Sequence, residues 1–133
     1  MNSSTSQTPS DRRKRVLVVD DDPDSRNAYV DILSVYGYVV DVACDALQAL
    51  EIIGKDEVKH DLIVTDNNMP RMTGRQMVTR LKDDGETVPV LMISGDHEVE
   101  LKQWARDAGV TFIPKPIDFD RFLDGVQTLL AHH

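Results

Sequence analysis

The sequence predicts an α/β fold: a doubly wound sheet of five parallel strands with helices on both faces, in three layers. Five short apolar runs alternate with five stretches of helical periodicity. Short strands joined by helices that are long enough to cross over form parallel sheets, and each such connection is right-handed. A chain of 133 residues fits one domain with one substantial core, and we expect that domain over residues 15–131.

The first half of the chain carries clear start and stop signals. A helix is expected to begin near Pro23, because Asp caps helices and Pro suits the first helical turn, and to end at Gly37. Tyr36 and Leu47 belong to the helical stripes that we expect to face the core. The expected elements up to Asp66 are strand 16–19, helix 24–36, strand 38–43, helix 45–54 and a third strand over 62–65.

The second half repeats the alternation. Among its aromatic residues, Phe119 and Phe122 are expected in the core, and Trp104 is the better candidate for a surface role. The expected elements are helix 75–82, strand 89–94, helix 98–108, strand 110–113 and helix 118–131.

Composition excludes several classes of protein. The chain is 41% hydrophobic and 29% charged, with no apolar run near the roughly 18 residues of a membrane helix. A net charge of −8 argues against general binding of nucleic acid. The one basic cluster, 12–15, follows a polar leader, and we expect residues 1–14 to be a disordered arm. One cysteine, Cys44, and no apolar leader point to the cytoplasm.

Polar residues follow the strands at the edge where all five carboxyl ends meet, which is where open α/β sheets bind ligands. Three clustered carboxylates repel, by about 1 kcal/mol per pair at 4 Å in water and about 4 at an effective dielectric of 20, so they need a cation. Oxygen ligands with open positions suit Mg²⁺ and a phosphoryl group. The residues expected at this edge are Asp20, Asp21, Asp66, Ser94 and Lys115.

The chemistry of this edge points to phosphoryl transfer. A metal, the Lys115 ammonium and the Ser94 hydroxyl can bind three oxygens of a phosphoryl group, with Asp66 as the nucleophile. Each residue also has a plainer interpretation: Asp66 before two asparagines as turn chemistry, the first aspartates as helix caps, and Lys115 as a surface lysine. The combination of charges at one edge favours the phosphoryl site.

The chain resembles the receiver domains of two-component response regulators, which include the chemotaxis regulators. Four motifs carry the resemblance over about residues 15–130: Val18-Val19-Asp20-Asp21, Thr65-Asp66-Asn67-Asn68-Met69-Pro70, Ile93-Ser94-Gly95 and Lys115-Pro116. The resemblance implies a flavodoxin-like sheet of order 2-1-3-4-5. It also implies that Asp66 accepts a phosphoryl group from a histidine kinase or phosphotransferase, forming 4-aspartylphosphate within a phosphorelay.

The same resemblance implies the remaining roles. Mg²⁺ would be bound by Asp21, Asp66 and the backbone carbonyl of Asn68, with Asp20 acting through water. Lys115 and Ser94 would bind the phosphoryl group, and Lys115-Pro116 would be a cis peptide. Ser94 and Phe112 would form the switch, which acts on a downstream protein partner through the face of the last two helices and the fifth strand. Such a module catalyses only its own phosphorylation and dephosphorylation and is otherwise no enzyme.

Three alternatives remain open from the sequence. A Mg²⁺-dependent aspartyl-phosphate phosphatase would need a second acid where Asn68 stands. A pseudo-receiver, a constitutive protein-binding module, is disfavoured by the intact Asp20, Asp21, Asp66 and Lys115. A flavin or nucleotide binder lacks a P-loop or another phosphate-binding run after the first strand.

Overall fold

A computed structural model describes residues 13–96 and 98–131. The predicted arm, residues 1–14, lies largely outside the described residues, which begin at Arg13. Strands and helices alternate strictly, and no helix of the described part is long and apolar enough to cross a membrane. In chain order they are β1 (Arg15–Val19), α2 (Pro23–Val35), β2 (Val39–Ala43), α3 (Ala46–Gly54), β3 (Leu62–Asp66), α4 (Gly74–Asp83), β4 (Val90–Ser94), α5 (Val99–Ala108), β5 (Thr111–Pro114) and α6 (Phe119–Ala131).

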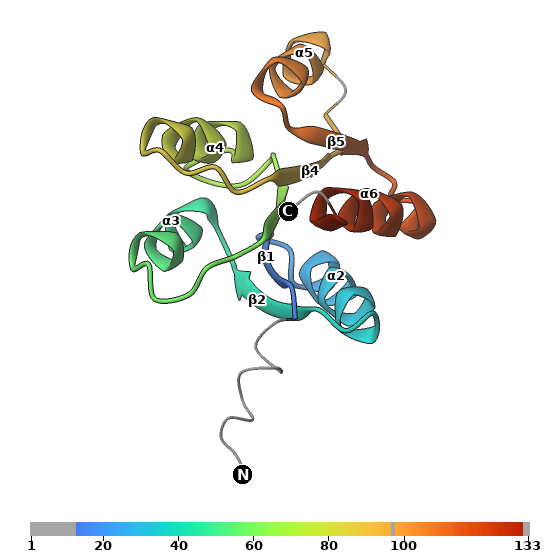
Figure 1. Cartoon of the computed structure of the whole chain (residues 1–133). Helices are drawn as coiled ribbons and strands as arrows, with labels where there is room; N and C mark the ends of the chain where they lie inside the picture. Colours follow the sequence, from blue (N-terminus) through green and yellow to red (C-terminus); the bar gives the residue numbers. More distant parts are fainter. Residues whose placement is uncertain (1–12, 97, 132–133) are drawn as a thin grey trace.

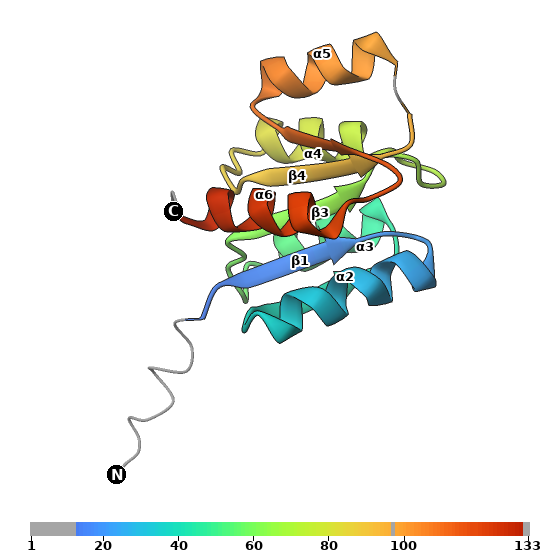
Figure 2. The same cartoon turned by 90° about the vertical axis from the view of Figure 1, so that its right-hand side faces the viewer.

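The strands form one sheet of order β2-β1-β3-β4-β5 in which every pair is parallel. Helices α2 and α6 cover one face, and α3, α4 and α5 cover the other (Figure 1). The side view shows the strands pointing in one direction, so that their carboxyl ends share one edge (Figure 2). The predicted fold class and strand order are confirmed.

The sheet separates two cores because successive side chains of a strand point to opposite faces. Leu17 and Val19 pack with residues of α3, α4 and α5, whereas Val16 and Val18 pack with residues of α2 and α6. The central strands β3 and β4 are buried along their whole length. Burial on both faces holds the ends of these strands in fixed positions. The positions of the polar residues that follow the strands are therefore fixed as well.

Capping residues fix where the helices begin and end. Asp22 caps α2 by accepting a hydrogen bond from the Ser25 N–H, and Thr73 forms a reciprocal capping box with Gln76 at the start of α4. Helix α5 ends at Gly109, whose φ of 73° is the left-handed conformation that glycine adopts readily.

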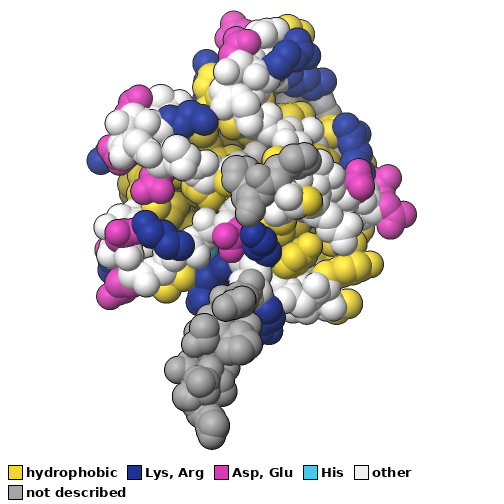
Figure 3. All heavy atoms as spheres, in the orientation of Figure 1, with side chains coloured by type: hydrophobic (Ala, Val, Ile, Leu, Met, Phe, Trp, Pro, Cys, Tyr) yellow, Lys and Arg dark blue, Asp and Glu magenta, His cyan; other side chains and the backbone are white. Residues whose placement is uncertain are grey.

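Three predicted core residues are exposed. Tyr36 is the C-cap of α2 and is 53% exposed, and Leu47 in the first turn of α3 is 48% exposed, while its neighbour Ala49 is buried. Phe119, the first residue of α6, is 41% exposed. Phe122, one turn later, is fully buried, which confirms the prediction for that residue. Tyr36 and Phe119 lie at helix ends, whereas Leu47 follows the fully buried Ala46 in the same turn of α3, so its side chain faces away from the core. On the face shown in Figure 3, basic and acidic side chains are interspersed along the helices.

Candidate functional site

The candidate site lies at the edge of the sheet where the strands end. Parallel registers pair Val19 with Thr65, Asp66 with Ile93, and Ser94 with Pro114. The residue after β1, the last residues of β3 and β4, and the residue after β5 therefore emerge next to one another. These residues are Asp20, Asp66, Ser94 and Lys115.

Three carboxylates converge at this edge. Asp20, Asp21 and Asp66 each offer an oxygen, and these oxygens all lie within 4.8 Å of one another. Asp20 is completely buried and Asp66 is 7% exposed, whereas Asp21 is exposed to solvent. The cluster is thus buried at Asp20 and Asp66 and open to solvent at Asp21, and we call it the acidic pocket.

Asp20 is held rigidly but is not fully satisfied. Its Oδ1 accepts a hydrogen bond from the Asp22 N–H at 2.9 Å, and its backbone carbonyl accepts one from Nη1 of Arg26 at 2.8 Å. Within residues 13–96 and 98–131, its buried Oδ2 has no hydrogen-bond partner. Burial raises the pKa of Asp20 to about 6, and the neighbouring charge of Asp66 adds to this effect.

Asp66 is bound by Lys115, the residue that follows β5. The Nζ of Lys115 donates to Oδ2 of Asp66 at 3.0 Å, and the Asn68 N–H approaches Oδ1 at 3.3 Å. The peptide bond between Lys115 and Pro116 is cis, as predicted. The Lys115 side chain is 32% exposed and that of Asp66 is 8% exposed, so the pair sits at the mouth of the pocket.

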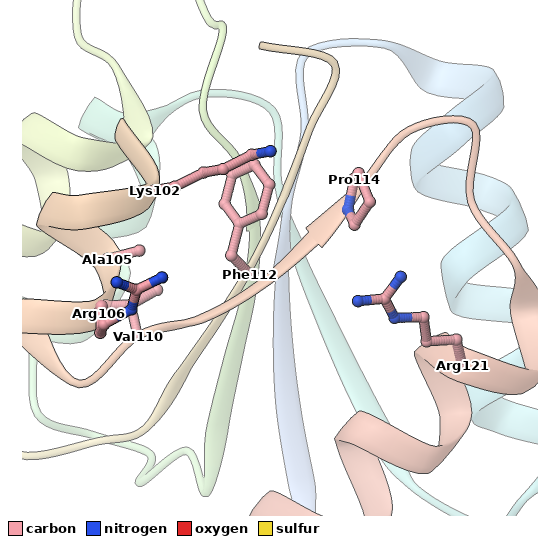
Figure 4. A pocket seen from close by; sticks show the side chains of 7 residues that line it. All are labelled: Lys102, Ala105, Arg106, Val110, Phe112, Pro114 and Arg121. Carbon is pink, nitrogen blue, oxygen red and sulfur yellow. The ribbon is translucent and has the colours of Figure 1, made fainter. Parts of the chain in front are cut away.

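Ser94 and Phe112 lie on the adjacent strands β4 and β5. Ser94 is fully buried, and its Oγ accepts a hydrogen bond from the Asp96 N–H at 3.0 Å, which leaves the hydroxyl proton to donate elsewhere. Phe112 pairs in register with Met92, two residues before Ser94, and is partly buried against the core beneath α5. The two side chains therefore lie on the same face of neighbouring strands. Phe112 also lines a groove of about 390 Å³ between α5, β5 and α6, together with the other side chains labelled in Figure 4.

The residues present fit a hard divalent cation. Three carboxylates face a single ammonium, so the pocket keeps a net negative charge, and the unpartnered Oδ2 of Asp20 has a desolvation cost that a cation or its bound water would relieve. All donors are oxygens, which Mg²⁺ and Ca²⁺ prefer, and the open side at Asp21 leaves room for water and an anion.

Sequence reasoning assigned no structural role to three individual residues that shape this edge. Arg26 anchors the Asp20 carbonyl from α2, and Asn67, which is 6% exposed, accepts a hydrogen bond from the Arg75 N–H through its Oδ1 at 2.9 Å. Gly74 lies so close to the backbone that an added Cβ would sit 2.4 Å from the Asp66 carbonyl oxygen. Two features of the sequence could have indicated these roles: the short polar residue Asn67 directly after β3, and Gly74 at the start of α4.

Comparison with known proteins decides the family. The sequence profile of the response regulator receiver domain matches residues 16–127. The chain belongs to the response regulator receiver family. Domains of this family are signalling modules of two-component systems, in which they interact with histidine kinases.

Individual relatives agree with this assignment. "Response regulator MprA" of Mycobacterium ulcerans is 35% identical over 117 residues, which are 87% of this chain and 50% of that protein. The chain thus spans about half the length of the curated relatives that it matches. Among solved structures, Vibrio cholerae chemotaxis protein CheY4 is 32% identical with a TM-score of 0.77, covering 88% of this chain and 98% of that one. The Francisella response regulator 1452 receiver domain is 26% identical with a TM-score of 0.83, covering 90% and 98%.

Proposed function

We propose that this receiver domain, residues 15–131, accepts a phosphoryl group on Asp66 from a histidine kinase or a histidine phosphotransferase. One observation carries the proposal: Asp66 sits in the acidic pocket with the Lys115 ammonium 3.0 Å from its Oδ2. A carboxylate held beside a cation, at the mouth of a pocket, is placed to be a nucleophile toward an incoming phosphoryl group.

The transfer needs only the Asp66 carboxylate and a phosphohistidine as reactants. A carboxylate oxygen of Asp66 attacks the phosphorus of a phosphohistidine, an O–P bond forms and the P–N bond breaks. The electron pair of that bond returns to the imidazole nitrogen. The product on the receiver is an acyl phosphate, and hydrolysis by water later restores the Asp66 carboxylate.

Mg²⁺ is the proposed cofactor. Asp21, Asp66 and the backbone carbonyl of Asn68 would bind it directly, and Asp20 would act through a bound water. When bound, the ion neutralises the acidic pocket and the charge of the phosphoryl oxygens. The unpartnered Oδ2 of Asp20 supports this proposal, because it is a buried acceptor that faces no donor within the described residues.

Two further residues would bind the phosphoryl group and report its presence. Lys115 would donate from Nζ to one phosphoryl oxygen and Ser94 from its hydroxyl to another. A Ser94 side chain that turns toward the phosphate leaves space for Phe112 to move inward, which changes the surface of α5, β5 and α6. A downstream protein partner bound to this face would then sense phosphorylation as a shift in population.

The experiment measures the intact mass of the protein after incubation with acetyl phosphate and Mg²⁺. Wild type is expected to gain one phosphoryl group, and Asp66→Asn none. Asp83→Asn, which removes an exposed carboxylate at the end of α4, is the matched control and should be labelled like wild type. Label that persists in Asp66→Asn would exclude Asp66 as the acceptor, and wild type that is never labelled would favour a constitutive binding module.

Metal binding is tested separately by thermal unfolding. Mg²⁺ at about 100 times its dissociation constant should stabilise the folded state by about 2.7 kcal/mol. Asp21→Asn should abolish this gain and leave the metal-free midpoint nearly unchanged, because Asp21 is exposed. An equal gain in Asp21→Asn would exclude this residue as a ligand.

A further inference from the structure

The loop that joins β3 to α4, residues 67–73, carries the one proposed metal ligand that is not a carboxylate, the backbone carbonyl of Asn68. The Gly74 N–H donates to the Asn67 carbonyl at 2.9 Å and closes the loop at its base. Asn68 itself is exposed to solvent. The position of its carbonyl therefore depends on the contacts that hold the middle of the loop.

Arg71 reaches from this loop to the start of α3. Its Nη2 donates to Oδ2 of Asp45, which is the N-cap of α3 and lies 26 positions earlier in the chain. The other carboxylate oxygen of Asp45, Oδ1, accepts a hydrogen bond from the Gln48 N–H at 2.8 Å. The Asp45 side chain is 16% exposed and that of Arg71 is 63% exposed. A carboxylate that is fixed by its own helix therefore holds a long side chain that faces solvent.

The backbone of Arg71 has a conformation that residues other than glycine rarely adopt. Its φ is 70°, in the left-handed region, where a Cβ approaches the following carbonyl oxygen. Such a conformation persists only where the surroundings hold it. Within the described residues, the contact with Asp45 is the only hydrogen bond or ion pair of the Arg71 side chain. This contact is therefore the one that opposes relaxation of the loop at Arg71.

The connection after β2 contacts both sides of the acidic pocket. The carbonyl of Ala43, the last residue of β2, accepts a hydrogen bond from the Asp20 N–H at 3.2 Å. Asp45, two residues later, binds Arg71. The aspartates that follow β1 and the loop that follows β3 are thus both attached to one short segment, residues 43–45. This segment links the carboxylate side of the proposed metal site to the side that carries the Asn68 carbonyl.

We propose that Asp45 and Arg71 are positioning residues of the Mg²⁺ site. Their ion pair stabilises the loop conformation that presents the Asn68 carbonyl to the metal. Without the pair, the loop spends part of its time in other conformations, and the apparent Mg²⁺ affinity falls in proportion to the fraction that remains competent. The inference rests on the proposed function, because it concerns the metal site that the proposed phosphoryl transfer uses.

Calorimetry measures the Mg²⁺ affinity of the full chain and of two variants that keep the local backbone. Asp45→Ser retains a helix cap on a side chain too short to reach Arg71, and Arg71→Asn introduces a residue type that tolerates a positive φ. Each variant should weaken Mg²⁺ binding by about three- to five-fold, which a partly exposed ion pair can supply. Arg71→Lys keeps the charge and should bind Mg²⁺ within about two-fold of wild type.

The two variants separate positioning from a simple effect of charge. A charge effect predicts opposite signs, because Asp45→Ser removes a negative charge near a cation site and Arg71→Asn removes a positive one. Positioning predicts that both variants weaken binding and that the double variant binds no more weakly than either alone. Tighter binding in Arg71→Asn, wild-type affinity in both variants, or losses that add in the double variant would overturn the proposal.

A kinetic measurement distinguishes positioning from a general loss of structure. In labelling by acetyl phosphate, the Mg²⁺ concentration that gives half the maximal rate should rise by the same factor as the dissociation constant. The rate at saturating Mg²⁺ should stay within about two-fold of wild type, because bound metal restores the competent loop. A lower saturating rate with an unchanged half-maximal concentration would make the role of the pair merely structural and overturn the proposal.

Lys59→Asn is the matched control. It removes the basic partner of another exposed ion pair, with Asp56, in the connection before β3 and hence at the opposite edge of the sheet. Its Mg²⁺ affinity should equal that of wild type, and a loss as large as in Arg71→Asn would overturn the proposal.

Asp21→Asn distinguishes failure of this inference from failure of the proposed function. Wild type that binds no Mg²⁺, or binding that is unchanged in Asp21→Asn, would contradict the proposed metal site and this inference with it. Binding that is lost in Asp21→Asn but unchanged in Asp45→Ser and Arg71→Asn would overturn the inference alone.

Discussion

The Nζ of Lys115 lies 3.0 Å from Oδ2 of Asp66, although the two residues are 49 positions apart in the chain. Asp66 ends the central strand β3, and Lys115 follows the edge strand β5, with β4 between them. The contact reaches across two strand pairings at the carboxyl edge of the sheet. It places the only ammonium that is bound to the acidic cluster, within the described residues, at the proposed phosphoacceptor.

Lys115→Gln should separate metal binding from phosphoryl transfer. Removing the ammonium deletes a positive charge that competes with a divalent ion for Asp66, so Mg²⁺ affinity should rise by about ten-fold, or about 1.4 kcal/mol. Labelling by acetyl phosphate should fall instead, because the phosphoryl group loses a donor. Calorimetry and intact mass measure the two effects. Lys82→Gln makes the same change in net charge at an exposed position in the last turn of α4 and should alter neither quantity.

The pKa of Asp20 predicts how stability depends on pH in the absence of divalent ions. Burial raises this pKa from 3.8 to about 6, so between about pH 4 and pH 6 the folded state holds a proton that the unfolded state has lost. Stability should therefore fall as the pH rises through this window, by up to about 3 kcal/mol. Urea unfolding of wild type and Asp20→Asn measures the difference, and the variant should lose this dependence.

Asp22→Asn is the control for that experiment. Its exposed carboxylate has a pKa lowered by hydrogen bonds from Ser25, so it titrates below the window, and Asn also caps helices well. The fall between about pH 4 and pH 6 should persist in this variant. If stability depends on pH equally in wild type and Asp20→Asn, the dependence comes from another titratable group.

Gly74→Ala should destabilise the domain and disturb the site together. The added Cβ would meet the Asp66 carbonyl oxygen at 2.4 Å, a contact that requires the backbone to move. Overpacking of this kind costs about 1–3 kcal/mol. Gly54→Ala is at the end of α3, where the added Cβ would have no atom of another segment within 4 Å. This substitution should be neutral or stabilising by up to about 1 kcal/mol. Denaturant midpoints compare the two, and equal effects would contradict the steric account.

Arg75→Ala should change the fluorescence of Trp104, the only tryptophan of the chain. The Arg75 guanidinium lies 5.5 Å from the centre of the Trp104 ring, a cation–π contact between α4 and α5. Its removal should shift the emission and cost about 0.5–1 kcal/mol of stability. Arg80→Ala, on the same helix, should leave the emission unchanged. An emission that is insensitive to Arg75→Ala would show that the contact is not populated in solution.

Periodicity predicted the elements well and the burial of their ends less well. All five strands and five helices occur close to the expected residues, because β-branched runs, capping aspartates and glycines act locally. Leu47 was wrong as a core residue because α3 turns Ala46 and Ala49 toward the core instead, and Phe119 because it is the first residue of α6, one turn before the buried Phe122. Periodicity locates a helical stripe but does not show which residues at the margins of the stripe the core covers, so it overestimates the core.

The sequence alone determined which residues end each strand, and hence that Asp20, Asp66, Ser94 and Lys115 share one edge. Strand direction follows from alternation, since each helix must return the chain to the same side. Only the tertiary structure decided the contact between Lys115 and Asp66 and the burial of the Asp20 Oδ2, which has no hydrogen-bond partner within the described residues. These depend on the packing of helices that are distant in sequence, which no local pattern specifies.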